Sequence, residues 1–400
     1  MLKYFYFSAS MRNAFLFISL FCVFCSTDKV RAQSDSLSQY PKNVFSIEPI
    51  FNIGSAIKNT PSFPPIGLAY ISELSFAWQT MGRKDWNHYY KFPTLGFSFV
   101  YGIFGNDQVI GRNYALMPHF ALDMARNFEM RIGCGLAYFP VKNDPITNPD
   151  NYLIGSHLST CVSMSMTWRK KLSKHFVLQL GGASFHSSNG HYQLPNVGLN
   201  SLVVTAGLKY FPSEVPVKTV KKDFAKIKYP LRFNVRLGLG AHEFGNEKGP
   251  IGGPKYAIYS SSLYLSKRYG GISNVHAGIS GRYYCNYYSY ISDSSLYSSG
   301  RQIKSCAFSV FLGYEFMCGH YSLLAQGAIN IYNPFYKYYH AVPKQDFFEF
   351  GETWNHNRLG VQYYLFKPSA QNHFNVFTGI YINANLGRAD FADVSLGFVF

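Results

Sequence analysis

One segment of the chain combines residue types that can carry out nucleophilic chemistry. His186 and Ser188 stand two positions apart, and Asn200 follows on the far side of a turn-rich stretch. Residues two apart on an extended strand point to the same face, so the first two side chains are expected to be neighbours. A serine hydroxyl beside an imidazole can act as a nucleophile with its base, and a third polar group can orient the imidazole. The residue types and spacing therefore allow a nucleophile, a base and an orienting residue at Ser188, His186 and Asn200, and they equally fit polar side chains that meet lipid headgroups at a barrel rim.

The sequence around these residues alternates in polarity with a period of two, which predicts two antiparallel strands. The apolar set of the first strand is Phe176, Leu178, Leu180 and Gly182, and that of the second is Leu202, Val204, Ala206, Leu208 and Tyr210. His186 and Ser188 share the parity of the first set, and Asn200 shares that of the second. In a membrane barrel the apolar set faces lipid, so all three predicted site residues are expected on the outer wall near one rim. A site in that position could act only on a lipid.

The same alternation recurs along the chain, and no long segment has a helical period. Residues 231–240, 306–316 and 374–386 each have one apolar face and one polar or small face. Sixteen candidate strands start near residues 44, 67, 93, 113, 128, 157, 173, 198, 229, 256, 273, 303, 319, 355, 372 and 391. The prediction is an all-β protein.

The beginning and the composition of the chain favour a membrane barrel over a soluble sandwich. An apolar run of residues 14–25, preceded by Lys3 and Arg12 and followed by Val30 and Ala32 at the two positions that a signal peptidase reads, predicts a signal peptide over residues 1–32 with cleavage near Ala32 and Gln33. Charged residues make up 14% of the 400 residues, whereas soluble proteins carry about a quarter. Strands can cross lipid with every backbone group paired only in a closed barrel. The last strand ends in Phe400, which resembles the C-terminal signal that the barrel-assembly machinery of bacterial outer membranes reads.

A lysine-rich stretch, residues 212–228, interrupts the strands after the eighth. We expect one transmembrane antiparallel barrel of about sixteen strands, in which this stretch is a periplasmic turn. The alternative is two eight-stranded barrels in tandem, with the stretch as a linker. The predicted organisation is therefore a signal peptide, a first strand region (residues 33–211), the lysine-rich turn or linker, and a second region (residues 229–400).

The motif around Ser188 also resembles a known family. His186, Ser188 and Asn189, followed by Pro195, Asn196 and Gly198 in a turn, are similar to the motif of the outer-membrane lipid A deacylases, often called acyloxyacyl hydrolases. In that family an eight-stranded barrel carries a serine nucleophile and a histidine base on its outer surface and hydrolyses an ester-linked acyl chain of lipid A. The resemblance covers about residues 44–211. It assigns the base to His186 and the nucleophile to Ser188, and it implies that Asn189 helps to hold the oxyanion. The second half of the chain looks like the extension of the long, Bacteroidetes-type members.

Asn200 departs from the family's pattern, which has an acidic residue there. An amide can accept a hydrogen bond from the histidine but cannot stabilise an imidazolium with a negative charge. The corresponding Asp-to-Asn change in a serine protease costs about 10⁴ in rate. The sequence thus leaves an inactive relative of the hydrolases open as an alternative.

The remaining expectations concern partners and cofactors. No metal or cofactor is predicted, since His186 and His191 have no Cys or acidic residue at ligand spacing. The net charge of +16 suits the phosphates of lipopolysaccharide better than nucleic acid. The leading hypothesis is an outer-membrane serine esterase acting on lipid A. The alternative from another class is a non-catalytic barrel, either a porin or a lipopolysaccharide-binding scaffold.

Overall fold

The computed structural model describes residues 40–58, 63–218, 227–246, 248–339 and 347–400. Residues 41–400 form one compact unit, and the described part of the chain contains sixteen strands, which confirms the all-β prediction. The first eight strands are β1 (Val44–Ala56), β2 (Leu68–Gln79), β3 (Thr94–Ile103), β4 (Arg112–Ala125), β5 (Phe128–Tyr138), β6 (Leu158–Lys171), β7 (Phe176–Ser188) and β8 (Leu199–Tyr210). The others are β9 (Leu231–Glu243), β10 (Lys255–Tyr269), β11 (Ser273–Tyr284), β12 (Cys306–Cys318), β13 (Tyr321–Tyr332), β14 (Asn355–Tyr364), β15 (Asn375–Asn385) and β16 (Arg388–Val399). The predicted signal peptide and its cleavage site lie outside the described residues.

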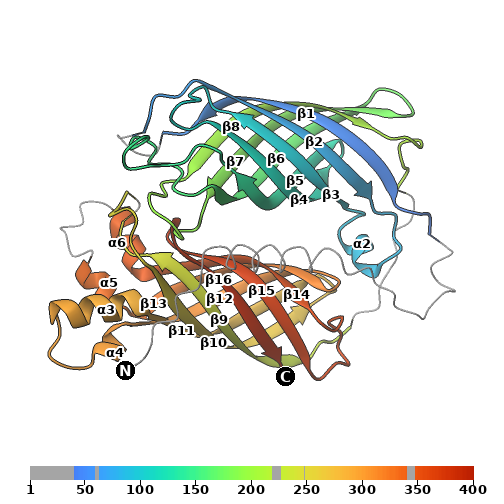
Figure 1. Ribbon diagram of the computed structural model, residues 1–400. Helices are drawn as coiled ribbons and strands as arrows, with labels where there is room; N and C mark the ends of the chain where they lie inside the picture. The colour runs from blue at the N-terminus through green and yellow to red at the C-terminus, as the bar shows by residue number, and fades with distance from the viewer. Residues whose placement is uncertain (1–39, 59–62, 219–226, 247, 340–346) are drawn as a thin grey trace. The chain divides into compact units, whose positions relative to one another are not determined.

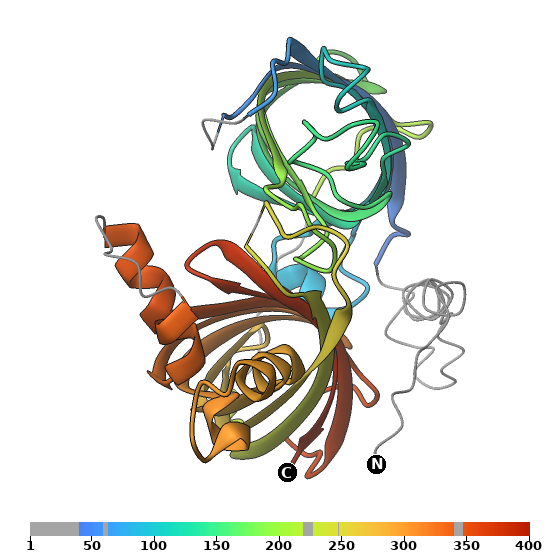
Figure 2. The same ribbon diagram turned by 60° about the vertical axis from the view of Figure 1, so that its left-hand side comes forward.

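The strands close into two separate eight-stranded antiparallel barrels, so the expectation of one sixteen-stranded barrel is wrong. In the first barrel β8 pairs with β1, with Ala206 opposite Phe51. In the second β16 pairs with β9, with Leu396 opposite Leu237. Figure 2 shows each ring of strands nearly end on. The alternation of side chains specifies the two faces of a strand but not which strand pairs with it. In the structure the free edge of β8 pairs with β1 and not with β9.

Each barrel has an apolar outer surface and an interior that holds many buried polar and charged side chains together with a smaller apolar cluster. On β1, Phe51 is 67% exposed, whereas Glu48 is completely buried inside the barrel. Part of the interior of the first barrel is occupied by ion pairs between buried side chains. Arg131 contacts Glu48, Glu73 and Glu129, and Lys209 Nζ lies 3.0 Å from Glu48. Small barrels of eight strands are normally filled by side chains in this way.

Short helices interrupt the connections between strands. They are α2 (Asp85–Tyr89) between β2 and β3, α3 (Cys285–Ser294) and α4 (Arg301–Lys304) between β11 and β12, and α5 (Pro334–Tyr339) and α6 (Phe347–Trp354) between β13 and β14 (Figure 1). None of the helices in the described ranges is long and apolar enough to cross a membrane.

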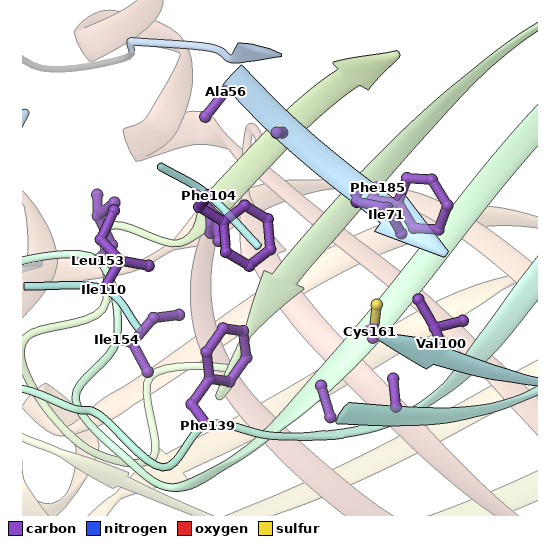
Figure 3. Close-up of a cluster of buried hydrophobic side chains, with 14 of the residues drawn as sticks. Ala56, Ile71, Val100, Phe104, Ile110, Phe139, Leu153, Ile154, Cys161 and Phe185 are labelled. Atoms are coloured by element: carbon purple, nitrogen blue, oxygen red, sulfur yellow. The ribbon is translucent and has the colours of Figure 1, made fainter. Parts of the chain in front are cut away.

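The loops at one end of the first barrel have an apolar core of their own. Phe104, Ile110, Phe139, Leu153 and Ile154, all in connections between strands, are almost completely buried and lie together (Figure 3). The cluster continues into the barrel through strand residues that are also buried. These loops are therefore fixed by packing, and they hold the segment that follows β7.

We predict that the ion pairs inside the first barrel are its main stability determinant among the charged residues. Replacing Arg131 by Met leaves three buried carboxylates without their shared partner and should cost about 3–5 kcal/mol of unfolding free energy. The matched control is Arg112→Met, because Arg112 and its partner Asp107 are about half exposed, and water and salt screen such a surface pair so that it contributes little to stability. Urea unfolding in detergent micelles, followed by tryptophan fluorescence, measures both changes. Three of the four tryptophans, Trp78, Trp86 and Trp168, belong to the first barrel region. Equal unfolding midpoints for the two variants would contradict the prediction.

Candidate functional site

The two ends of the site motif meet as cross-strand neighbours. His186 on β7 lies directly opposite Asn200 on β8, and the His186 ring nitrogen Nδ1 is 2.7 Å from the Asn200 side-chain oxygen Oδ1. An amide oxygen only accepts hydrogen bonds, so Nδ1 carries the proton in this contact. In a neutral ring the second nitrogen, Nε2, is then left with its lone pair available to accept a proton.

The outer face predicted from parity is the face observed for these two residues. His186 is exposed and Asn200 is half-buried. The apolar residues of the same parity on β7 and β8 are likewise exposed or half-buried. Leu180 and Leu202 are 42% and 61% exposed, while the intervening Ser187 and Ser201 are buried inside the barrel. The imidazole is therefore accessible from outside the barrel.

Ser188, which parity also predicted on the open outer wall, is instead only 7% exposed at the end of β7, because the following loop covers it. Its hydroxyl oxygen accepts hydrogen bonds from the Asn196 side-chain amide at 2.9 Å and from the Gly190 backbone N–H at 3.2 Å. The hydroxyl itself donates to the Asn196 side-chain oxygen Oδ1, with 3.2 Å between the two oxygen atoms. Within the described part of the chain no hydrogen bond joins Ser188 to His186. Attack by this hydroxyl requires its proton to turn from Asn196 toward the imidazole, a tightening that is common when substrate enters such sites.

Gly198 marks the place where His186 and Ser188 approach each other. A Cβ added to Gly198 would lie 3.2 Å from Cε1 of His186 and 3.7 Å from Cβ of Ser188. The φ angle of Gly198 is +79°, a conformation that favours glycine. A methyl group at this position would therefore press on the His186 ring, which would have to shift slightly, and would be in ordinary contact with Ser188.

Backbone hydrogen bonds fix this stretch of the loop. The N–H groups of Val197 and Gly198 donate to the carbonyl oxygens of Tyr152 and Leu153, both at 3.1 Å. Leu153 belongs to the buried cluster at the end of the first barrel (Figure 3). The packing of the connecting loops thus determines how closely Gly198 covers the site.

Asn189, the predicted oxyanion residue, is used differently in this structure. Its side-chain nitrogen donates to Ser156 Oγ at 3.0 Å and to the Gln193 carbonyl at 2.7 Å, which engages both amide hydrogens. Its backbone N–H donates to the Asn196 oxygen at 3.0 Å. The structure brings Gly190 and Asn196, rather than the Asn189 side chain, into contact with the serine oxygen. Sequence reasoning treated Asn196 and Gly190 as turn residues; the only signal for Asn196 was its place in the Pro-Asn-x-Gly turn.

His191, the second histidine of the loop, is not arranged as a metal ligand. Burial lowers the pKa of its imidazole to about 4, so the ring is neutral near pH 7. Among the residues that the structure describes, no group of three or more His, Cys, Asp or Glu side chains is placed to hold a metal ion.

Two family models match the chain. Residues 72–209 match that of lipid A 3-O-deacylase (PagL), and residues 231–400 match that of the acyloxyacyl hydrolase C-terminal domain. No curated protein matches the sequence.

Solved structures that resemble the chain are remote. They include CdiB from Acinetobacter baumannii, at 8% identity and a TM-score of 0.18, with 90% of this chain and 60% of CdiB covered. OccAB3 from the same organism, at 8% identity, and the outer membrane protein opdK from Pseudomonas aeruginosa, at 10%, each have a TM-score of 0.21 and cover 90% of this chain and 98% of their own. Scores this low carry no argument about this chain.

The position of Gly198 leads to a prediction about the reactivity of Ser188. In Gly198→Ala the added methyl group presses on the imidazole, and a displacement of about 1 Å at a reacting group can cost about 100-fold in rate. The measurement is the rate at which a fluorophosphonate probe labels Ser188; the serine oxygen attacks phosphorus and fluoride leaves. Gly252→Ala is the matched control, because Gly252 has a φ of +82° and nothing within 4 Å of an added Cβ. If both variants label equally fast, Gly198 does not set the site geometry.

Proposed function

We propose that this protein is an outer-membrane serine esterase that removes an ester-linked acyl chain from lipid A. The chain belongs to the lipid A 3-O-deacylase and acyloxyacyl hydrolase family. The activity of that family is lipid A deacylation. The observation that carries the proposal is the hydrogen bond of His186 to Asn200 on the lipid-facing wall, next to the covered hydroxyl of Ser188. The apolar exterior of both barrels and the family agree with an outer-membrane location. Cleavage of the signal peptide near Ala32 and Gln33 and insertion by the barrel-assembly machinery through the last strand remain predictions, as does a Bacteroidetes-type origin.

In the proposed reaction Ser188 Oγ attacks the ester carbonyl carbon while Nε2 of His186 takes the hydroxyl proton. The tetrahedral intermediate collapses with cleavage of the ester C–O bond, and His186 gives the proton to the leaving alcohol. A water molecule, deprotonated by the same imidazole, then hydrolyses the acyl-serine ester and releases the fatty acid. Asn200 holds the ring in the tautomer that leaves Nε2 as the base.

The negative charge that forms during attack needs hydrogen-bond donors close to the serine. We infer the Asn189 region as their source, by resemblance to the family. For its side chain to serve, Asn189 must release Ser156 or Gln193, to which it now donates. The Gly190 N–H and the Asn196 amide already point at Ser188 Oγ, which supports the proposal that this loop supplies donors to the developing charge.

The substrate explains the charge of the protein. Lipid A presents ester-linked acyl chains to the barrel wall and phosphate groups at the membrane surface. An excess of Lys and Arg, with a formal net charge of +16, favours binding of a densely anionic lipid.

The porin alternative loses its main support. It relied on the lumen of a sixteen-stranded barrel, and the two eight-stranded barrels have no such lumen. Buried ion pairs around Arg131 occupy the interior of the first barrel. The inactive-relative alternative is tested by the variants below.

We predict that Ser188→Ala abolishes deacylation, because no other group replaces the nucleophile. Mass spectrometry of lipid A from cells expressing each variant measures the outcome. The wild type should yield lipid A that lacks one acyl chain, and Ser188→Ala should yield the uncleaved form. Ser187→Ala is the matched control, since Ser187 is the adjacent serine and faces the barrel interior. Identical lipid A from wild type and Ser188→Ala would reject the proposed reaction.

We predict that Asn200→Asp accelerates the reaction. A carboxylate 2.7 Å from Nδ1 would stabilise the imidazolium that forms during attack. The reverse change in a serine protease costs about 10⁴, which sets the upper limit of the gain. The test is kcat for release of fatty acid from lipid A in detergent micelles, with Asn200→Asp/Ser188→Ala as the control for serine dependence. A kcat for Asn200→Asp equal to or below that of the wild type would show that the charge at this position does not limit catalysis.

A further inference from the structure

The loop after Ser188 also makes hydrogen bonds with the first hairpin of the C-terminal domain. Leu194 is completely buried, and its backbone N–H donates to the carboxylate of Glu243 at 3.0 Å. Glu243 is the last residue of β9, and its own N–H donates to the His191 carbonyl at 3.2 Å. Two bonds thus join one residue of β9 to both ends of the segment 191–194.

Glu243 is itself completely buried, and every contact of its carboxylate is a donor. One oxygen accepts the Gly253 N–H at 2.6 Å, and the other accepts the Leu194 N–H and pairs with the Lys255 ammonium group. The same ammonium group lies 5.7 Å from the centre of the Tyr192 ring, within cation–π range. Glu243 therefore contacts His191 and Leu194 of the loop, and its ion-pair partner Lys255 contacts Tyr192.

The neighbouring loop residues transmit these contacts to the serine. Gly190 and Asn196, which donate to Ser188 Oγ, stand immediately before and two positions after the segment 191–194. A Cβ added to Gly190 would lie 3.4 Å from Cβ of Ala392 on β16, so the loop also packs closely there. A shift of residues 191–194 would move both donors away from Ser188.

The chemistry of the carboxylate argues against a role confined to the β9–β10 hairpin. Burial of a charged group is unfavourable unless it is fully hydrogen-bonded. A buried backbone N–H such as that of Leu194 requires an acceptor as well. Glu243 meets both requirements only when the loop is seated, because the Leu194 N–H completes its set of donors.

We propose that Glu243 is a positioning residue for the site, which holds residues 191–194 so that Gly190 and Asn196 face Ser188. The proposal rests on Ser188 being the nucleophile, and it gives the C-terminal domain a part in arranging the site of the first barrel. Glu243 does not touch the substrate; it acts through the loop.

The test compares Glu243→Ala and Glu243→Gln in the full-length protein in detergent micelles. Hydrogen exchange of the amides of residues 191–194 reports on the loop, independently of any activity. The rate of fluorophosphonate labelling reports on Ser188. Glu315→Gln is the matched control, because Glu315 on β12 is equally buried and hydrogen-bonded, to His276 and Ser322, within the second barrel. Folding of each variant is checked by its heat-dependent mobility on gels.

We expect Glu243→Ala to raise amide exchange at Leu194 and to slow labelling of Ser188 by about 10- to 100-fold, the loss typical of a misplaced reacting group. Glu243→Gln keeps one acceptor oxygen and should fall between Ala and the wild type, and Glu315→Gln should behave as the wild type does. Unchanged exchange at Leu194 would overturn the proposal, and so would raised exchange with unchanged labelling. If the wild type itself fails to label, the proposed function fails, and Glu243 is then judged by exchange alone: faster exchange in Glu243→Ala supports its hold on the loop.

Discussion

The structure depends on one constraint, which is that every backbone N–H and C=O group of a strand in lipid must be paired within the protein. Each set of eight strands meets this constraint by closing on itself, through β1 with β8 and β9 with β16. Closure at eight strands leaves an interior that side chains fill and an exterior that must be apolar. Polar chemistry on the exterior is therefore confined to the rim, where His186 and Asn200 lie.

The site combines parts with different origins. His186 lies opposite Asn200 because the register of β7 and β8 pairs these two residues. Ser188 stands where β7 ends, so its surroundings come from the loop: Gly190, Asn196 and Gly198. That loop is held in turn by the backbone of Tyr152 and Leu153 and by Glu243. A rigid sheet thus positions His186, the proposed base, and packed loops determine how Ser188, the proposed nucleophile, is placed beside it.

Much of the fold could be predicted from the sequence. Alternation of polarity gave sixteen strand starts that lie within three residues of those observed, because burial on one face of a strand repeats every second residue. It also placed His186 and Asn200 on the outer wall. The number of barrels could not be obtained in this way, since the choice of β1 rather than β9 as the partner of β8 is a contact between residues far apart in the chain.

The site was predictable to a smaller extent, for a related reason. The residue types His186, Ser188 and Asn200 were visible as a motif, but the cover over Ser188 depends on turns whose contacts leave no periodic signal. Gly198 illustrates the limit: a glycine in a turn is ordinary, and only the neighbouring imidazole shows why a larger residue does not fit. Glu243 lies more than 50 residues from Ser188 in the sequence, and nothing near it suggests a contact with the loop.

The amide at Asn200 can be understood from its position on the membrane-facing wall. A carboxylate there would stabilise an imidazolium, but it would also place a charge beside lipid, where charged groups are costly unless paired. With His186 as its only hydrogen-bonding partner among the described residues, a carboxylate would be paired only while the ring is protonated. An amide keeps the ring oriented in both states without a net charge. An amide at this position therefore favours a stable resting wall over a rapid reaction, and a carboxylate in its place would gain rate at the cost of an unpaired charge beside lipid while the ring is neutral.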